Sequence, residues 1–277
     1  MFEVIERRQD GVHEWVAISC TCDLANPRDE LVRSTAGLVR NAYGEDVIVE
    51  AWLAMEPDPE IAETFTVDHL VAGFRMGLPN PASEGNKPPQ LTNYRSESAE
   101  MLARGALACA FESLQFLIAP QGGKLNPNQP ILGFDGWAIR ATEEQGAALV
   151  LVQVKATSVL ETPPPESSVL AEECKRLPRQ KGPIARVLSV MAKHLPNGQM
   201  RSAVLRMLTR LGSGELPALV VAPVLIRGVG SSALADLAPI VDVTADFHPA
   251  AGCGASVSLG VDLNEFGRKV MDAARAA

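Results

Sequence analysis

Two neighbouring apolar segments with the composition of β-strands, Pro130–Ala141 and Ala147–Thr157, constrain the fold of this chain most strongly. A short stretch rich in polar residues and glycine separates them, which is typical of a hairpin turn. Asp135 lies in the first segment, and the second ends in Val-Gln-Val-Lys-Ala, with the amide at Gln153 and the lysine at Lys155. Since strand side chains alternate between faces, Gln153 and Lys155 share one face, and hairpin pairing can bring them beside Asp135.

An acid, an amide and a lysine at one end of a hairpin suit the hydrolysis of a phosphodiester. In-line cleavage builds negative charge on the attacking and leaving oxygens, and one or two hard cations stabilise that charge. Mg²⁺ prefers oxygen ligands. Asp135 offers a charged oxygen and Gln153 a neutral one, while Lys155 can orient the attacking water or contact a phosphate oxygen. We therefore expect a site for Mg²⁺ or Mn²⁺.

These residues resemble the motif of the PD-(D/E)XK nuclease superfamily, in its Asp…Gln-x-Lys variant. The resemblance implies a Mg²⁺-dependent nuclease of the α/β class, with a restriction-endonuclease-like core in which helices flank a central mixed sheet. It also implies a further metal-binding glutamate on the helix before the hairpin. Glu97 and Glu100 both qualify, because residues three apart share a helix face. We favour Glu100, one turn deeper, as a catalytic residue and metal ligand with Asp135 and Gln153.

Residues 91–277 also resemble, more distantly, the nuclease subunit of the Hachiman anti-phage defence system. The resemblance is carried by the Tyr-Arg…Glu…Glu-Met-Leu-Ala helix from Tyr94, the Gly-Phe-Asp-Gly-Trp and Val-Gln-Val-Lys segments, and the later Ala222-Pro223-Val224-Leu225-Ile226. It implies a DNA substrate, an antiviral role and a separate helicase-type partner. No P-loop or dinucleotide motif is present in the sequence, so no nucleotide cofactor is expected.

The charge distribution predicts where nucleic acid would bind. The chain has a net charge of −8, yet Cys174–Arg210 contains no Asp or Glu and nine basic residues. A segregated basic segment in an acidic protein is a candidate track for phosphates; a solvated helix face or a dock for an acidic partner are the alternatives. The residues expected to bind nucleic acid are Lys175, Arg176, Arg179, Lys181, Arg186 and Lys193.

Periodicity along the chain predicts two regions, an N-terminal α/β region over residues 1–90 and the nuclease core over 91–277. Strands are expected at Met1–Glu6, His13–Cys20, Asp46–Leu53, Leu216–Ile226 and Ile240–Thr244, in addition to the hairpin. Helices are expected at Pro27–Val39, Ala62–Met76, Ser96–Ile118, Glu166–Leu177, Gly182–His194, Met200–Leu211 and Leu263–Ala276.

Composition narrows the class of protein further. No apolar run reaches the roughly 18 residues that span a bilayer, and Met1–Asp10 does not look like a signal peptide. The five cysteines form no disulfide framework or zinc pattern, so we expect reduced thiols in a cytoplasmic protein without membrane contact. Three alternatives stay open: a restriction-type nuclease, a nuclease acting on RNA, and an inactive module that binds nucleic acid or a partner.

Overall fold

The computed structural model describes residues 1–55, 65–85, 92–116, 133–141 and 146–276. Over these residues one mixed sheet has the strand order β1-β2-β7-β6-β5-β4-β3. The strands are β1 (Phe2–Asp10), β2 (His13–Cys20), β3 (Leu114–Gln115), β4 (Gly136–Arg140), β5 (Ala148–Thr157), β6 (Leu219–Arg227) and β7 (Ala251–Ser258). The chain therefore has an α/β fold built on a mixed sheet.

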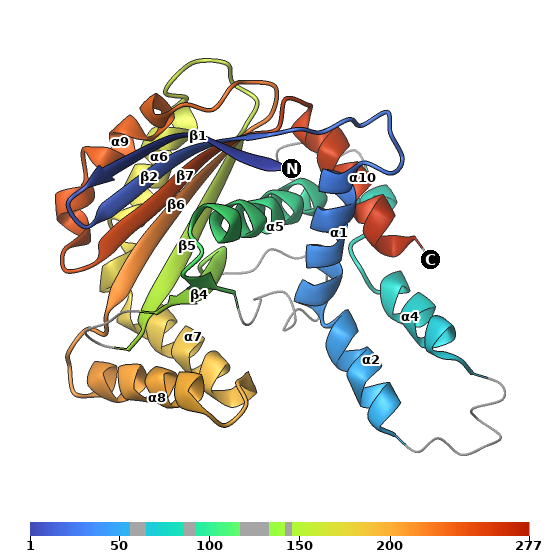
Figure 1. Ribbon diagram of the computed structural model, residues 1–277, viewed down its shortest axis with the longest axis horizontal. Coiled ribbons are helices and arrows are strands. Elements are labelled where there is room, and N and C mark those ends of the chain that lie inside the picture. The colour runs from blue at the N-terminus through green and yellow to red at the C-terminus, as the bar shows by residue number, and fades with distance from the viewer. Residues whose placement is uncertain (56–64, 86–91, 117–132, 142–145, 277) are drawn as a thin grey trace.

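Helices cover both faces of this sheet (Figure 1). One face carries α1 (Glu30–Tyr43), α5 (Asn93–Ala110) and α10 (Leu263–Arg275), and the other carries α6 (Pro165–Cys174), α7 (Lys181–His194), α8 (Gln199–Gly212) and α9 (Ala238–Val241). The helices α2 (Glu45–Ala54) and α4 (Val67–Met76) bury none of their described residues and extend away from the sheet.

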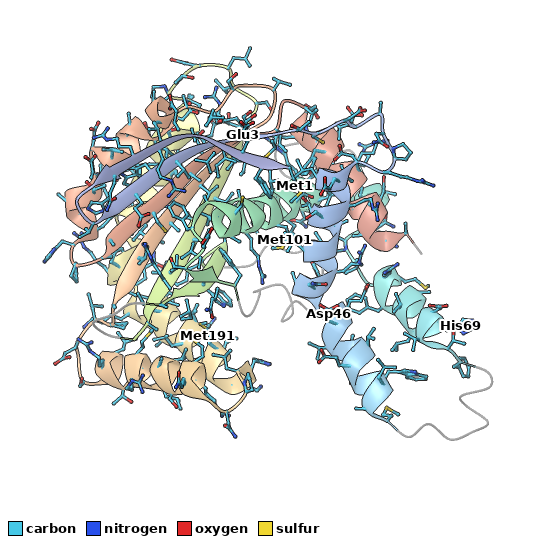
Figure 2. All side chains as sticks on the ribbon, viewed as in Figure 1. Met1, Glu3, Asp46, His69, Met101 and Met191 are labelled. Atoms are coloured by element: carbon cyan, nitrogen blue, oxygen red, sulfur yellow. The ribbon has the colours of Figure 1, made fainter. Side chains whose placement is uncertain are left out.

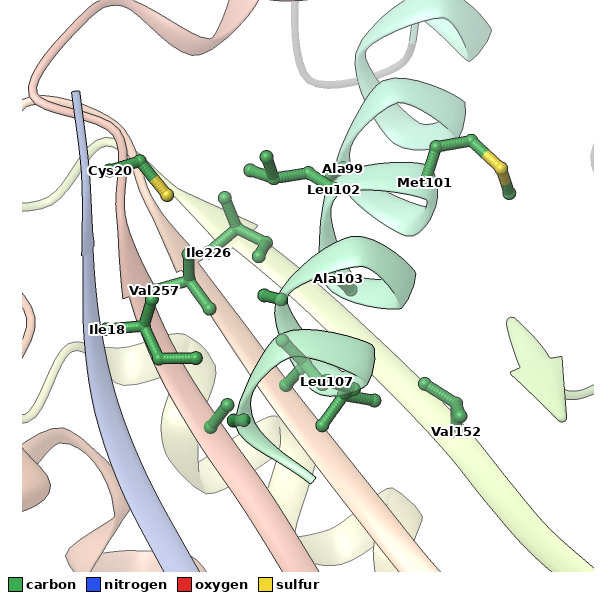
Figure 3. Packing of buried hydrophobic residues seen from close by; sticks show 14 of the residues in the cluster. Ile18, Cys20, Ala99, Met101, Leu102, Ala103, Leu107, Val152, Ile226 and Val257 are labelled. Carbon is green, nitrogen blue, oxygen red and sulfur yellow. The ribbon is translucent and has the colours of Figure 1, made fainter. Parts of the chain in front are cut away.

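Each face of the sheet has its own apolar core, and the alternation of strand side chains decides which residues enter it. In β5, Val150 and Val152 pack toward α5, whereas Leu149 and Leu151 pack toward α6 and α7. Figure 3 shows α5 lying over the sheet in the first core. Met101 on α5 and Met191 on α7, labelled in Figure 2, belong to the two different cores.

Most elements expected from the sequence are present with shifted ends, but two predicted strands are wrong. Residues 46–53 belong to helix α2, and residues 240–244 run from the end of α9 through a turn to the start of a short 3-10 helix, Thr244–Phe247. The β preference of Val and Ile is weak and yields to context. At the start of α2, Glu45 and Asp46 favour a helix N-terminus, and Glu45 is held by Arg75 at 2.9 Å.

The helix predicted from Ser96 to Ile118 ends at Ala110 and is followed by the short strand β3. The hairpin turn over 142–145 and the first residues of the predicted segment at 130–132 lie outside the described residues, as do parts of the predicted helix ends at 62–64 and 117–118.

The N-terminal strands belong to the same sheet as the rest of the chain. Strand β2 runs parallel to β7, with Trp15 beside Gly254, and β1 pairs antiparallel with β2 at the sheet edge. Helix α1 packs against α5 and α10. The sheet thus extends across the boundary expected near residue 90.

Strand β7 escaped the sequence analysis because glycines interrupt its apolar pattern. The structure explains them, since the Trp15 ring lies across this strand. A Cβ atom added at Gly254 would be 2.7 Å from that ring and 2.9 Å from Pro223, and one at Gly252 would be 3.1 Å from the ring. Glycine within a strand often marks such a close approach.

We predict that Gly254→Ala lowers the free energy of unfolding by about 1–3 kcal/mol, because Trp15 and Pro223 must move to admit the methyl group. Denaturant unfolding of the two proteins measures the difference. Gly182→Ala is the matched control, since nothing lies within 4 Å of a Cβ atom at that position. Equal stability of the Gly254→Ala variant and the parent would contradict the close packing of Trp15.

Candidate functional site

The candidate site lies where β5 extends beyond the end of its pairing with the neighbouring strand β4. The antiparallel pairing begins at Gly136, which faces Val152, so β5 continues beyond it with an edge that β4 does not cover. A backbone N–H on such an edge needs another acceptor. Asp135 supplies it, because its Oδ2 accepts a 2.7 Å hydrogen bond from the Val154 N–H. The acid is thereby fixed beside the last residues of β5, as the sequence predicted.

Gln153 and Lys155 lie on the face of β5 that α6 covers, and both contact Glu173 on that helix. The Gln153 side-chain amide donates a 3.0 Å hydrogen bond to Glu173 Oε2, and the Lys155 ammonium lies 2.7 Å from Glu173 Oε1. One carboxylate therefore holds both polar side chains of the Gln-x-Lys segment. The site combines two carboxylates, one amide and one ammonium group.

Glu173 was missed from the sequence, although it is the residue that joins Gln153 to Lys155. The only signal was its position on the helix that follows the strand. Helical periodicity cannot tell which strand residue such a side chain reaches. About a third of the Glu173 side chain is exposed, so its ion pair with Lys155 is screened by solvent and holds the lysine only loosely.

Burial and nearby charges set the proton affinity of Asp135. Burial raises its pKa from the ordinary 3.8 to about 6, and the negative charge of Glu173 adds to this effect. The hydrogen bond from Val154 and the positive charge of Lys155 oppose the increase. A carboxylate in this environment gains from a nearby cation, because the cation offsets the cost of keeping the charged form away from water.

The two candidate glutamates of α5 occupy different surroundings. Glu97 is buried and accepts a 2.8 Å hydrogen bond from the Tyr43 hydroxyl, whose pKa rises through burial and this acid. Glu100 lines a small pocket together with Asp135, Trp137 and other residues of the hairpin. Glu100, and not Glu97, therefore shares a pocket with Asp135, whereas Gln153 and Lys155 lie on the opposite face of the sheet from α5.

The oxygen atoms of the site suit a magnesium ion that is bound by few protein ligands and keeps most of its water ligands. Within the described residues, Asp135 Oδ1 and the side-chain carbonyl oxygen of Gln153 have no hydrogen-bond partner, so both oxygens are available to bind a cation. Those residues contain no group of three or more His, Cys, Asp or Glu side chains placed to hold a metal. Magnesium is commonly bound through one or two carboxylates plus water.

The basic segment is not gathered at the candidate site, because it runs from the turn after α6 through a short 3-10 helix, Leu177–Arg179, and on over α7 and α8. Lys175, the residue after the end of α6, pairs with Glu172 at 2.6 Å, and Arg179 lies 3.9 Å from Asp246. Lys181 donates to the Gly214 carbonyl at 3.2 Å. The remaining residues of the predicted track, Arg176, Arg186 and Lys193, are exposed.

Three of the five cysteines, Cys20, Cys174 and Cys253, are buried, while Cys22 is half-buried and Cys109 is exposed. All five are free, and burial raises the pKa of Cys20, Cys22 and Cys253 to about 12. These three side chains are therefore protonated at neutral pH. Among the described residues, no helix has both the length and the apolar character needed to cross a bilayer.

The chain was compared with known protein families and with curated proteins. Neither a protein-family model nor a curated protein matches the chain.

We predict that Asp135→Asn stabilises the metal-free protein at neutral pH. Asparagine can still accept from Val154 but carries no charge. Because the folded pKa of about 6 exceeds the ordinary 3.8, the parent loses stability as pH rises from about 4 to about 6, whereas the variant does not. Its advantage should grow across that window and then level off.

Denaturation in EDTA at a series of pH values measures this difference. The control is Asp246→Asn, which removes one carboxylate on the exposed surface near Arg179. If the stabilities of Asp135→Asn and the parent follow parallel curves over the whole range, the carboxylate of Asp135 does not resist ionisation.

Proposed function

We propose that this protein is a metal-dependent nuclease that cleaves phosphodiester bonds of DNA. The observation that carries the proposal is the convergence of Asp135, Gln153 and Lys155 at the uncovered edge of β5, with Asp135 bonded to the backbone between the other two. If these residues only ended a strand in solvent, water could satisfy Asp135, Gln153 and Lys155, and the contacts among them and with Glu173 would not be needed. An acid beside an amide and a lysine on one strand end is the arrangement that suits phosphodiester hydrolysis.

The order of elements around the site supports the same proposal. Helix α5 precedes the antiparallel strands β3, β4 and β5, and then come α6 and the parallel strand β6. A mixed sheet with helices on both faces is what the resemblance to the PD-(D/E)XK superfamily implies. We propose that residues from α5 to β6 form a restriction-endonuclease-like core, to which β1, β2 and β7 add an extension.

The side chains divide the work of the proposed reaction. Asp135 and Gln153 would hold a magnesium ion, with Glu100 assisting from the α5 side of the sheet; when bound, the ion supplies positive charge to the reacting phosphate and acidity to a water ligand. Lys155 carries a positive charge toward the oxygens on which negative charge develops. Glu173 orients Lys155 and Gln153 through its two oxygens. Water would attack phosphorus and give up one proton to solvent, while the bond from phosphorus to the leaving oxygen breaks and solvent protonates that oxygen.

The resemblance to the Hachiman nuclease subunit supports a narrower proposal, that the chain is the effector of an anti-phage complex with a helicase partner. Restraint by a partner would suit a nuclease that shares a cell with its own chromosome. Alternatives from other classes are a restriction-type enzyme, a nuclease for structured RNA, and an inactive module that binds nucleic acid or protein. Digestion of DNA and RNA in parallel distinguishes them.

We predict that the purified chain cleaves plasmid DNA when Mg²⁺ or Mn²⁺ is present and that Asp135→Ala and Lys155→Ala abolish cleavage. Loss of one donor of transition-state charge stabilisation costs about 10²–10³-fold in rate. Glu173→Ala should reduce the rate less, because it acts through Lys155. Gel analysis of plasmid and of a structured RNA gives the rates and the substrate class.

The matched control is Glu172→Ala, which removes the neighbouring carboxylate of α6, exposed and paired with Lys175. Circular dichroism checks that each variant folds. Full activity of folded Asp135→Ala or Lys155→Ala would rule out this site, and metal-dependent binding without cleavage by the parent would favour the inactive module.

Gln153→Glu separates metal binding from catalysis. The new carboxylate would lie beside Glu173, where Gln153 now donates at 3.0 Å, and two adjacent carboxylates repel each other. We predict a lower melting temperature in EDTA and its recovery in Mg²⁺, with half-maximal cleavage at an equal or lower Mg²⁺ concentration than in the parent.

The double variant Gln153→Glu, Glu173→Gln restores one amide beside one carboxylate and should melt like the parent in EDTA. A melting temperature of Gln153→Glu that Mg²⁺ does not raise, or a greater need for Mg²⁺ in cleavage, would show that residue 153 is not a metal ligand.

A further inference from the structure

A second positively charged feature lies apart from the candidate site, in a cavity of about 810 Å³ between α1, α4 and α10. Figure 1 shows α1 and α10 side by side, with α4 next to them. Four arginines line the cavity, namely Arg28, Arg33, Arg40 and Arg75, together with Glu30 and the small residues Ser34, Ala36, Ala273 and Ala276. None of these residues lines the pocket at Asp135.

The hollow exists because short side chains form its floor. Arg33, Ala36 and Arg40 share one face of α1 at helical spacing, and Ala273 and Ala276 lie opposite. Arg33 and Arg40 thus lie about two turns apart on this face of α1, with the small side chain of Ala36 between them. Three parts of the chain that are distant in sequence form the cavity, so no local sequence motif predicts it.

Ion pairs hold two of the four arginines in place. Glu45 Oε2 lies 2.9 Å from Arg75 Nε, and Glu45 Oε1 lies 3.4 Å from Arg40 Nε. The hydrogen bond to Glu45 raises the pKa of Arg75, and Arg75 also donates to the Ala276 carbonyl at 2.6 Å. A guanidinium fixed by such contacts needs little further ordering when a ligand binds.

The other two arginines are available to an incoming anion. Within the described residues, the side chains of Arg28 and Arg33 are exposed and have no hydrogen-bond or ion-pair partner. The nearby Asp29 carboxylate does not neutralise them, because it is buried and accepts from the backbone of Asp23 and Val32. With Glu30 and Glu45 counted, the four arginines leave an excess of two positive charges.

We propose that this cavity binds phosphate groups, either in a nucleic-acid backbone or in a free polyphosphate. Guanidinium groups match phosphate oxygens in charge and in paired hydrogen-bond geometry. The cavity is large enough for several phosphates, since ligand sites commonly measure about 300–1,000 Å³. Among the described residues, none that lines the cavity is an aromatic on which a base could stack. Binding therefore depends on phosphate and not on the base, and it does not rest on the proposed nuclease activity.

The test measures binding of three probes to the full chain in EDTA: tripolyphosphate, ATP and a 5′-phosphorylated single-stranded oligonucleotide. We expect tripolyphosphate and ATP to bind with similar affinity if free polyphosphate is the ligand, and the oligonucleotide alone to bind if the backbone is. The double variant Arg28→Ala, Arg33→Ala should lower the affinity for the probe that binds by about tenfold or more. For the oligonucleotide, the salt dependence should fall by about two units of slope.

The matched control is Arg8→Ala, Arg268→Ala, which removes two exposed arginines that do not line the cavity and should leave the affinity unchanged. The proposal is overturned if the parent binds none of the three probes, if the Arg28→Ala, Arg33→Ala variant binds them as the parent does, or if polyglutamate binds as tightly as the phosphate probes. The last result would indicate a site for acidic protein segments.

Discussion

The burial of β6 on both faces is the constraint on which the rest of the structure depends. All nine residues of this strand are buried, with β5 on one side and β7 on the other. A strand without a solvent face requires helices above and below it, and both layers are present. Even the arginine at its end, Arg227, is buried, and it is paired with Asp236 and bonded to the Val159 and Glu161 carbonyls.

The candidate site depends on the unequal lengths of two neighbouring strands. Because β4 starts at Gly136 while β5 runs on to Thr157, the last residues of β5 are half-buried and hold polar side chains close to the core. Asp135 satisfies the backbone there at the cost of a carboxylate that resists ionisation. The hydrogen bond from Val154 by itself favours the charged form of Asp135, but burial outweighs it and raises the pKa, so the buried carboxylate favours a cation at this position.

Positive charge in this acidic chain is collected at two separate surfaces. One consists of the helices from Lys175 to Arg210, which lie on the α6 side of the sheet, and the other is the arginine cavity formed by α1, α4 and α10. The first is continuous in the sequence, and its role as a track for phosphates stays a prediction. The second is assembled from three separate segments, residues 28–40, Arg75 and residues 273–276, and the fold alone brings them together.

The sequence by itself determined the hairpin strands, the shared face of Gln153 and Lys155, and the nearness of Asp135, because strand periodicity and a short connection act over a few residues. Only the tertiary structure decided that Glu173 contacts both side chains and that β2 joins β7. It also decided that residues 46–53 form a helix. Those outcomes depend on which surfaces meet when the layers pack, and a local pattern carries no information about a partner distant in the chain.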